Sequence, residues 1–572
     1  MNDASGSTAS QALADLGERY FTTQHTFDPY SATLLGIQDF DHLGNDPSLE
    51  ASQRAAEDFR DIADQLRGIR TGGLNAAEQL DYEVLTTLVW GGERDAHHAQ
   101  WATNASAKSY VSRQALIFQA VPAMTIADTA GGERYLSRLN TVAASLTGLG
   151  SRYFEEAERG RTAPAIGIQH AIQQLHGYAA LPLDQDVLLK PTRVETGRAF
   201  RERGMKIVRD SIRPAMITLA DRMRDELLSG ARDDGHVGIL NVPGGTDIYA
   251  DSVRRHTTTN LDPGEIHARG MEILADQREE WSKLGMSALG TGNFDDIRTR
   301  LRDDATLRFQ SRKQIIKVAE NALERAEEAR SRAFPPFDIA RCVIEEINPI
   351  DAEHAALAYY RPPAADGSRP GAHCLLTTDP ASRYSYEYEA LAFHESTPGH
   401  HLQLATAQTL QIPRYRRYLD TELCSFIEGW GLYAETLADE LDLYTDDLQR
   451  LGMLSFSSLR ACRLVIDTGI HHYGWSRERA MRFMWENTVT TKANVRNEVD
   501  RYIAWPGQAL AYMIGRQEIM RLRTEAKWNL GDRFSLSGFH RAVLENGAVP
   551  LSVLAHAVGR WEQEINTEEG AA

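Results

Sequence analysis

The feature that most constrains the fold of this chain is a repeated spacing of apolar residues that fits one face of an α-helix. Side chains at i, i+4, i+7 and i+8 lie on the same side of a helix and can pack together against a core. Two segments keep this spacing over several turns: Ala55, Phe59, Ile62, Ala63 and Leu66, and later Ile315, Ala319, Ala322, Leu323 and Ala326. A helix start is also marked at Asp262, a capping residue that is followed by Pro263 and by Glu265 at the third helical position. The spacing predicts a mainly helical protein.

Strand-like runs are few and short. Three segments read as strands closed by proline, glycine or asparagine, namely residues 236–242, 341–347 and 373–378. A loop rich in proline and glycine at residues 361–371 precedes the last of them. We therefore expect a mainly α fold with a small β-sheet. A domain boundary near residue 260 or near residue 340 is compatible with the sequence, which fixes neither.

Composition narrows the classes of protein and of partner. The 572 residues carry 80 acidic and 62 basic side chains, a formal charge of -18, which argues against nucleic acid or an anionic membrane surface as the main partner. The four cysteines are widely spaced with no CxxC pair, so neither a disulfide framework nor a thiolate zinc site is indicated. The N-terminus has no basic region followed by an apolar run, and no stretch approaches the length of a membrane span. We expect a soluble, cytoplasmic protein.

The stretch HESTPGHH at residues 394–401 begins as the zinc-peptidase motif H-E-x-x-H does, but Pro398 stands where the second histidine belongs. On a straight helix His400 would point about 120° away from His394. His401 would return to the face of His394 but lie about 10 Å from it along the axis, too far for bonds of about 2.1 Å to one zinc ion. A straight helix therefore cannot make a metal site here.

Pro398 changes this geometry because it has no N–H to donate to the carbonyl of His394 and it disfavours helical dihedrals at the residue before it. If Pro398 and Gly399 bulge out of the helix and absorb two residues, His400 returns to the position of the second histidine. We favour His394 and His400 as metal ligands and keep His401 as the competing assignment. The alternative is a histidine-rich helix turn without a metal.

Neutral imidazoles suit Zn²⁺, and Glu395 beside the first ligand could take a proton from a water on the ion. A third ligand is needed, and Glu428 is the best candidate because its neighbours are apolar and a carboxylate there needs a cation. Gly429 and Gly431 would let another helix or the metal approach closely. Glu435, seven residues after Glu428 and on the same helix face, is the second choice or a partner that orients a ligand histidine. A buried ion pair is the alternative for Glu428.

Several segments together resemble the bacterial domain-of-unknown-function family 885, whose members are zincin-like metallopeptidases. The segments are LAFHESTPGHHLQ (391–403), FIEGWGLYAE (426–435), RYIAWPGQALAYMIGRQEI (501–519), DPYSATLLG (28–36), the run at 361–380, LVIDTGIHHYGWS (464–476) and FHRAVLENGAVPLSVL (539–554). The resemblance covers nearly the whole chain and implies a single domain over residues 1–572. It implies a helical, clam-like scaffold in which two lobes could flank a central cleft. Residues 394–401 would then lie at the floor of the cleft. It also implies His394, His400 and Glu428 as ligands of one Zn²⁺ and Glu395 as the general base. Many relatives are exported.

The chemistry would need supporting groups. Tyr512 is the first candidate to stabilise an oxyanion, with a core tyrosine as the equally weighted alternative. His471 could orient or polarise a substrate, with Asp467 four residues earlier fixing its tautomer, although a surface pair explains them as well. Arg501 and Arg516 could clamp a substrate carboxylate. His401 could contact substrate or support the site.

The strand at residues 373–378 could bind an extended substrate by strand addition, or simply form the edge of the small sheet. The leading functional hypothesis is a zinc-dependent hydrolase of a small peptide or a peptide-like amide. Two histidines and a carboxylate also define the site of non-haem Fe(II) enzymes, but Glu395 favours hydrolysis. A metal-dependent biosynthetic enzyme and a non-catalytic binding scaffold are further alternatives. The sequence does not indicate the oligomeric state.

Overall fold

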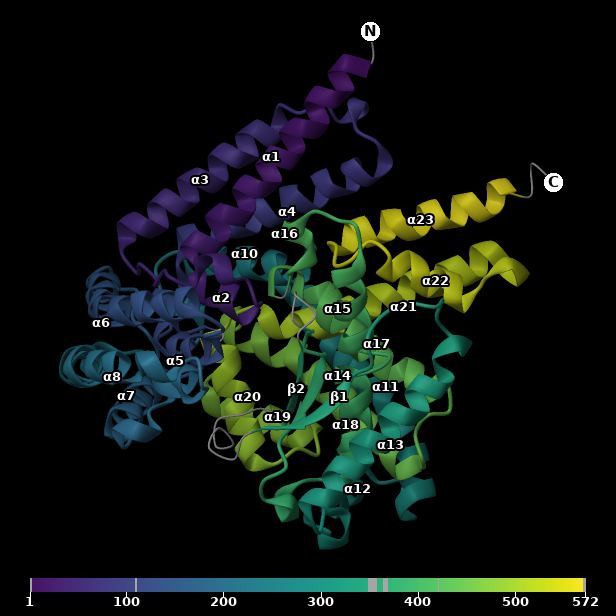
Figure 1. The fold of residues 1–572 in the computed structure, drawn as a ribbon. Helices are drawn as coiled ribbons and strands as arrows, with labels where there is room; N and C mark the ends of the chain where they lie inside the picture. Colours follow the sequence, from purple (N-terminus) through teal and green to yellow (C-terminus); the bar gives the residue numbers. More distant parts are fainter. Residues whose placement is uncertain (1–2, 109–110, 348–356, 364–368, 420, 569–572) are drawn as a thin grey trace. The chain divides into compact units, whose positions relative to one another are not determined.

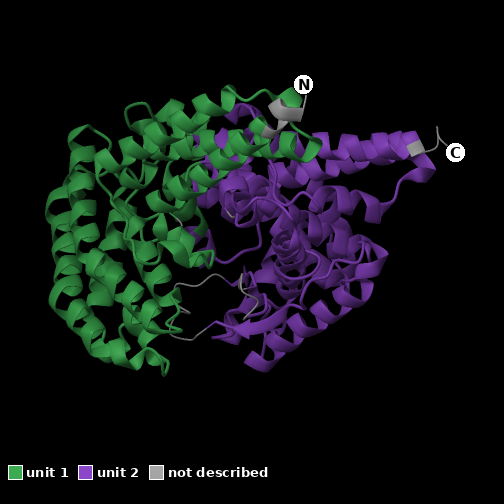
Figure 2. Cartoon of the chain, turned by 45° about the horizontal axis from the view of Figure 1, so that its top comes forward, with its two compact units in different colours: residues 1–251, 470–479, 498–506 green, residues 252–469, 480–497, 507–572 purple. Residues whose placement is uncertain are grey.

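The computed structural model describes residues 3–108, 111–347, 357–363, 369–419 and 421–568. These residues form two compact units (Figure 2). Unit 1 contains residues 1–251, 470–479 and 498–506, and unit 2 contains residues 252–469, 480–497 and 507–572. The chain passes between the units more than once, so neither unit is a single continuous segment. One of these passages, at residue 251, lies close to the boundary that the sequence allowed near residue 260.

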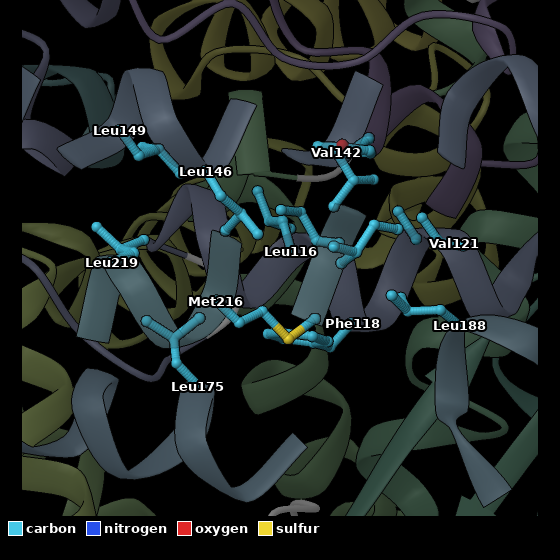
Figure 3. Packing of buried hydrophobic residues seen from close by; sticks show 14 of the residues in the cluster. Leu116, Phe118, Val121, Val142, Leu146, Leu149, Leu175, Leu188, Met216 and Leu219 are labelled. Atoms are coloured by element: carbon cyan, nitrogen blue, oxygen red, sulfur yellow. The ribbon is translucent and has the colours of Figure 1, made fainter. Parts of the chain in front are cut away.

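The regular elements of unit 1, in the residues that the structure describes, are all helices, and the first part of the chain forms most of them (Figure 1). Its helices are α1 (Asp3–Phe27), α2 (Pro29–Leu34), α3 (Leu49–Arg67), α4 (Ala76–His98), α5 (Arg113–Ala123), α6 (Thr129–Glu158), α7 (Ala165–Ala180), α8 (Arg198–Ile207), α9 (Arg213–Arg222) and most of α10 (Gly245–Thr257). Helices α5, α6, α7 and α9 share one apolar core, part of which is seen in Figure 3. Leu116, Val142, Leu175 and Met216, one from each helix, meet there.

The apolar face expected around residue 59 is confirmed in α3. Ala55, Phe59, Ile62 and Leu66 are buried, and Ser48 caps the helix by accepting a hydrogen bond from the N–H of Ala51. A capping serine of this kind stabilises a helix by about 1 kcal/mol. The capping residue and the buried apolar face of α3 therefore both support the helix that the spacing predicts.

The prediction of a strand at residues 236–242 is wrong. Ile239–Asn241 form a short 3₁₀ turn instead. The carbonyl groups of Val237 and Gly238 accept hydrogen bonds of 2.6 and 2.7 Å from the buried guanidinium of Arg232. Because a side chain satisfies these backbone groups, the segment needs no neighbouring strand. A short apolar run alone could not reveal that partner.

Unit 2 holds the remaining helices and the sheet (Figure 1). The helices are α11 (Pro263–Leu289), α12 (Phe294–Asp303), α13 (Arg312–Ala329), α14 (Tyr388–Glu395), α15 (His400–Thr409), α16 (Arg414–Arg417), α17 (Cys424–Glu440), α18 (Asp447–His471), α19 (Arg477–Asn487), α20 (Lys492–Ala504), α21 (Ala511–Leu530), α22 (Leu536–Leu544) and α23 (Leu551–Glu568). Parts of α18, α19 and α20 belong to unit 1. The predicted start of α11 is confirmed, with Asp262 as its cap, and the predicted face of α13 is buried.

The sheet has three strands, β1 (Val343–Glu346), β2 (Ala358–Arg361) and β3 (Ala372–Leu375), in the order β1-β3-β2. β1 and β3 confirm two of the predicted strands, whereas β2 was not expected. β3 pairs in parallel with β1 and antiparallel with β2. Both of its edges are therefore used, so the two alternatives for this strand, strand addition by a substrate and the edge of the sheet, are both wrong. The predicted loop at 361–371 includes residues 364–368, which lie outside the described residues.

One face of the sheet packs against α13 and α14. Leu375 of β3, Ala358 of β2, Ile315 of α13 and Leu391 of α14 belong to one buried cluster. This packing fixes α14, whose last two residues are His394 and Glu395. The described part of the chain is mainly α with a small sheet, as the sequence predicts. No described helix is long and apolar enough to cross a membrane.

Helices α17 and α21 cross in close contact at two glycines. A Cβ on Gly429 would lie 2.6 Å from the backbone of Gly515, and a Cβ on Gly515 would lie 1.8 Å from the carbonyl oxygen of Ser425. Only hydrogen fits at these points, because non-bonded carbon atoms stay about 3.5 Å apart or more. The crossing brings the helix of Glu428 against the helix of Tyr512.

Candidate metal centre

The helix that carries HESTPGHH is interrupted where the sequence predicts. α14 ends at Glu395 and α15 begins at His400, with a cis peptide bond between Thr397 and Pro398. A Cβ on Gly399 would lie only 1.9 Å from the carbonyl oxygen of His394, so glycine is the residue that lets the turn fold back against α14. The turn absorbs the extra residues and returns His400 to the side of His394. Their ring centroids are 4.7 Å apart.

Side chains outside the turn hold it in place. The hydroxyl of Thr397 donates to Glu327 of α13 at 2.5 Å. The indole N–H of Trp430 in α17 donates to the carbonyl oxygen of Pro398 at 3.0 Å. The turn is thus tied to two helices, and α17 is the helix that also carries Glu428.

Three atoms that could bind a metal ion converge at this point. Nε2 of His394 and Nε2 of His400 each lie 3.5 Å from Oε2 of Glu428, and the three atoms all lie within 4.8 Å of one another. Bonds of about 2.1 Å at tetrahedral angles would place ligand atoms about 3.4 Å apart. Two of the three separations therefore match a zinc site closely. Over the described ranges, this is the one group of three histidine, cysteine, aspartate or glutamate residues that could hold a metal ion.

The charges of the three residues are mutually dependent. Burial opposes ionisation of Glu428, but His394 and His400 outweigh it and hold the pKa of Glu428 well below its usual range. Burial likewise disfavours a charged His394, yet Glu428 and Glu435 prevail and raise the pKa of His394 to about 9. Two carboxylates thus stabilise a positive charge at His394. A divalent cation would supply that charge in place of the proton.

Glu435 contacts the ring of His394, as in the alternative prediction that it orients a ligand histidine and does not itself bind the metal. Its Oε1 lies 2.8 Å from Nδ1 of His394, which leaves Nε2 facing Glu428 and His400. Glu435 is almost fully buried, and the guanidinium of Arg460 in α18 lies 3.7 Å from the same oxygen. A carboxylate that binds the far nitrogen of a ligand histidine fixes the ring and raises its basicity.

Gly431 lies under the ring of His394, as expected for a small residue beside the site. A Cβ at this position would be 2.7 Å from Cε1 and 2.8 Å from Nε2 of His394. The two glycines of FIEGWG thus have different neighbours. Gly429 lets α21 approach α17, and Gly431 leaves room for the ring of His394.

Glu395 is accessible to solvent, as a general base would need to be. It follows His394 at the end of α14 and is partly exposed, whereas the seven residues before it are buried. Among the described residues, no side chain forms a hydrogen bond or an ion pair with its carboxylate. The side chain of Glu428 is also 22% exposed. Solvent therefore reaches both carboxylates.

His401 does not join the three ligand atoms. Its Nδ1 lies 3.0 Å from the hydroxyl of Tyr360 in β2, and its Nε2 lies 2.8 Å from the carbonyl oxygen of Ala340. Both ring nitrogens are used in joining α15 to the sheet region. His400 is therefore the histidine that the structure brings to His394, and the competing assignment of His401 as second ligand is wrong.

Two other candidates lie in unit 2. Tyr512 is buried in α21, one turn before the glycine crossing with α17, and the guanidinium of Arg463 lies 4.3 Å from its ring centroid. Arg516 donates from Nη1 to Ser457 at 3.1 Å. Burial lowers the pKa of Arg516, while Glu435 opposes this effect. Arg516 thus lies in the polar surroundings of Glu435, and its clamp on a substrate stays a prediction.

His471 and Arg501 belong to unit 1. Nδ1 of His471 accepts from the N–H of Ile239 at 3.1 Å, and its Nε2 donates to the carbonyl oxygen of Tyr502 at 2.9 Å. Burial lowers the pKa of His471 to about 3, so the ring is neutral. Backbone groups therefore fix the tautomer of His471. The spacing suggested Asp467 for this role, but the carboxylate of Asp467 accepts hydrogen bonds from the N–H of Gly507.

Both ring nitrogens of His471 are therefore committed to the backbone. Nη1 of Arg501 lies 3.8 Å from Oε1 of Glu498, within the same unit. The roles of His471 and Arg501 toward a substrate remain predictions.

Sequence reasoning missed two residues near the centre. Arg460 beside Glu435 lies in LRACR, which carries no recognisable motif. His373 of β3 is fully buried, and neither ring nitrogen has a hydrogen-bond partner among the residues that the structure describes. Burial, with a smaller contribution from His394, lowers the pKa of His373 to about 3. Its position opposite Tyr360 in the sheet register could be found only from the structure.

The fold and site define a helical protein with a potential His–His–Glu metal centre at a broken helix. Residues 29–558 match the family described as "Bacterial protein of unknown function (DUF885)", and the chain belongs to that family. The resemblance noted from the sequence is thus confirmed at the level of the family.

Two solved structures are similar over almost their whole length. One is described as "the putative lipoprotein from Colwellia psychrerythraea"; it is 25% identical, with a TM-score of 0.88, and the match covers 97% of this chain and 99% of that one. The other is "a putative lipoprotein of unknown function from Shewanella oneidensis", 16% identical with a TM-score of 0.72 over 95% of this chain and 99% of that one. The second likeness shows the fold alone. No curated protein matches the chain.

Proposed function

We propose that this protein is a zinc-dependent hydrolase that cleaves a peptide or a peptide-like amide bond, with a zincin-like arrangement of its catalytic groups. The observation that carries the proposal is the convergence of His394, His400 and Glu428, with two separations of 3.5 Å that suit a tetrahedral ion. Glu395 supports hydrolysis in particular, because an oxidative iron enzyme has no evident need of a free carboxylate beside its first ligand.

A zinc ion held by these three atoms would polarise a substrate carbonyl and lower the pKa of a water molecule. The residues of the chain have separate tasks around it. Glu435 binds Nδ1 of His394, which would leave Nε2 to hold the ion. Glu395 would accept the proton of the attacking water and pass it to the leaving amine. Tyr512 is the candidate donor to the oxygen that gains charge in the transition state, where one such hydrogen bond is worth about 3 kcal/mol.

The proposal is tested with a library of short peptides and N-acyl amides, read by mass spectrometry, with the metal content of each sample measured in parallel. Wild type loaded with zinc should cleave some of them, and a chelator should stop the reaction. Glu395→Gln should keep its metal and lose about 10²–10⁴-fold in rate, the usual contribution of a general base. His394→Ala should lose both metal and turnover, and so serves as the comparison for Glu395→Gln.

An unchanged rate in Glu395→Gln would remove the proposed base from the mechanism. Zinc-loaded wild type that cleaves no member of the library would contradict the peptidase assignment and favour a biosynthetic enzyme or a binding scaffold. Iron in place of zinc would favour an Fe(II) enzyme. The cytoplasmic location expected from the sequence stays a prediction, because each of the two similar structures is described as a "putative lipoprotein". Cell fractionation would decide it.

A further inference from the structure

A small cavity in unit 1, whose lining includes none of the residues of the metal centre, gathers hydrogen-bond donors. It lies where the start of α7 meets the segment before α5 and the end of α20. Its lining includes Asn104, Ser106, Lys108, Ile166, His170 and Asp500. None of these residues was singled out by the sequence motifs, and the proposed hydrolysis does not use them.

The start of α7 supplies the first donors. Its N-cap residue, Pro164, offers no side-chain acceptor, and the N–H of Ala165 donates to the carbonyl oxygen of Arg232. No described group accepts a hydrogen bond from the N–H of Ile166 or Gly167, both of which line the cavity. The first N–H groups of a 16-residue helix carry partial positive charge and favour an anion.

Gly167 lets this helix end approach the opposite wall. A Cβ at Gly167 would lie 2.1 Å from the carbonyl oxygen of Ala105, so no larger side chain fits there. The close approach brings the free N–H groups of α7 beside the segment that carries Asn104, Ser106 and Lys108.

Asn104 provides independent evidence for a ligand. It is 1% exposed, and its Oδ1 accepts a hydrogen bond of 3.0 Å from Nη2 of Arg232. That bond fixes the orientation of the amide, so the group left over is the Nδ2 donor. In the part of the chain that the structure describes, Nδ2 has no hydrogen-bond partner. A buried donor without an acceptor costs about 1–3 kcal/mol, and a ligand with an acceptor atom would remove that cost.

Two basic side chains, Lys108 and His170, and one carboxylate, that of Asp500, line the cavity. Burial lowers the pKa of Lys108, although Asp500 opposes this effect, and burial lowers the pKa of His170 as well. Asp500 is the one carboxylate in the lining, and it already forms a two-pronged ion pair with Arg477 at 2.6 and 3.1 Å. Its negative charge is therefore largely committed to Arg477.

We propose that this cavity is a binding site for a small oxyanion, the carboxylate or phosphate group of a metabolite. The N–H groups of Ile166 and Gly167 and the Nδ2 of Asn104 would donate to its oxygens, and Lys108 would balance its charge. Its lining shares no residue with the metal centre, so a ligand bound there would act as an effector or a structural anion and not as the substrate of the hydrolysis.

The test is calorimetric titration of the full-length protein with inorganic phosphate and, separately, with acetate, in a buffer free of other oxyanions. Wild type should bind at least one of them saturably. Lys108→Met and Asn104→Asp should each weaken binding about tenfold or more, because each removes a charge-assisted or buried donor. Asn104→Asp keeps the acceptor for Arg232 but places a negative oxygen where Nδ2 stands. Lys190→Met, which changes an exposed lysine of the same unit, is the matched control and should bind as wild type does.

A second measurement separates binding from folding. Since burial disfavours the charge of Lys108, Lys108→Met should unfold at the same temperature as wild type or higher when no anion is present. Phosphate or acetate should then raise the unfolding temperature of wild type and of Lys190→Met, and raise that of Lys108→Met much less. Equal binding by wild type and both cavity variants, or no binding of either anion to wild type, would overturn the proposal. Preference for phosphate or for acetate would identify which head group the site takes.

Discussion

Replacing Gly431 by alanine tests the geometry of the metal centre without touching a ligand. The new Cβ would lie 2.7 Å from Cε1 of His394, whereas ordinary van der Waals contact begins at 3.4 Å. The ring must therefore move by about 0.7 Å, or α17 must move away from it. The ring cannot turn aside freely, because Glu435 binds its Nδ1 and the residue is buried. Metal–ligand distances in good sites vary by only about 0.2 Å, so Nε2 would leave bonding range.

We expect Gly431→Ala to bind zinc at least about tenfold more weakly than wild type, the lower end of what displacing the support of a ligand costs. Competition with a chromogenic chelator measures the affinity, and circular dichroism checks that the variant is folded. Gly559→Ala, in α23 of the same unit, is the control, because a Cβ there meets no atom within 4 Å. A folded Gly431→Ala protein that binds zinc as tightly as wild type would refute the placement of the His394 ring.

Two further predictions follow from the charges around His394. Zinc must displace a proton from His394, whose pKa is about 9 without metal, so the apparent affinity should rise about tenfold per pH unit up to about pH 9 and level off above it. An ordinary histidine would level off near pH 6.5, and a plateau there in chelator competition across the pH range would contradict the predicted environment of His394. Glu435→Gln removes the orienting charge, so it should weaken zinc binding about 10–100-fold and move the plateau to lower pH. An unaltered pH profile in this variant would show that Glu435 does not act on His394.

The broken helix was accessible to sequence reasoning because its cause is local. Pro398 cannot donate to the carbonyl of His394, and a bulge that absorbs two residues brings His400 to the position of the second histidine, the assignment that the sequence favours over His401. The same logic identified Glu428, since a carboxylate among apolar neighbours needs a cation or a partner. The structure brings these three residues together.

The remaining support of the site depends on contacts between distant segments. Spacing could place Glu435 on the face of Glu428, but whether it binds a metal or a histidine depends on which ring nitrogen of His394 faces it. Arg460 contacts Glu435 from α18, and no sequence pattern within α18 predicts this contact. The tautomer of His471 was assigned to a neighbour on the same helix, whereas the backbone of Ile239, 232 residues away, fixes it. Helical spacing predicts neighbours along a helix and not those across a packing interface.

The strands were also hard to predict, because strand formation depends on partners that lie elsewhere in the sequence. Residues 236–242 have the composition of a strand, yet the guanidinium of Arg232 satisfies their carbonyl groups. β2 is only four residues long and is defined by its pairing with β3, so nothing in AYYR distinguishes it. Whether a strand lies at the edge or in the centre of a sheet depends on its partners, which is why the predicted edge strand β3 is the central one.

The most direct test of the account is the metal content of the protein purified without added metal, measured by elemental mass spectrometry in wild type and in Glu428→Ala. The account predicts about one zinc ion per chain in wild type and a large loss in the variant, because Glu428 supplies the atom to which both histidine nitrogens lie 3.5 Å distant. Wild type that holds no metal even after reconstitution, or a Glu428→Ala protein that keeps its zinc, would contradict the assignment of a metal centre to HESTPGHH.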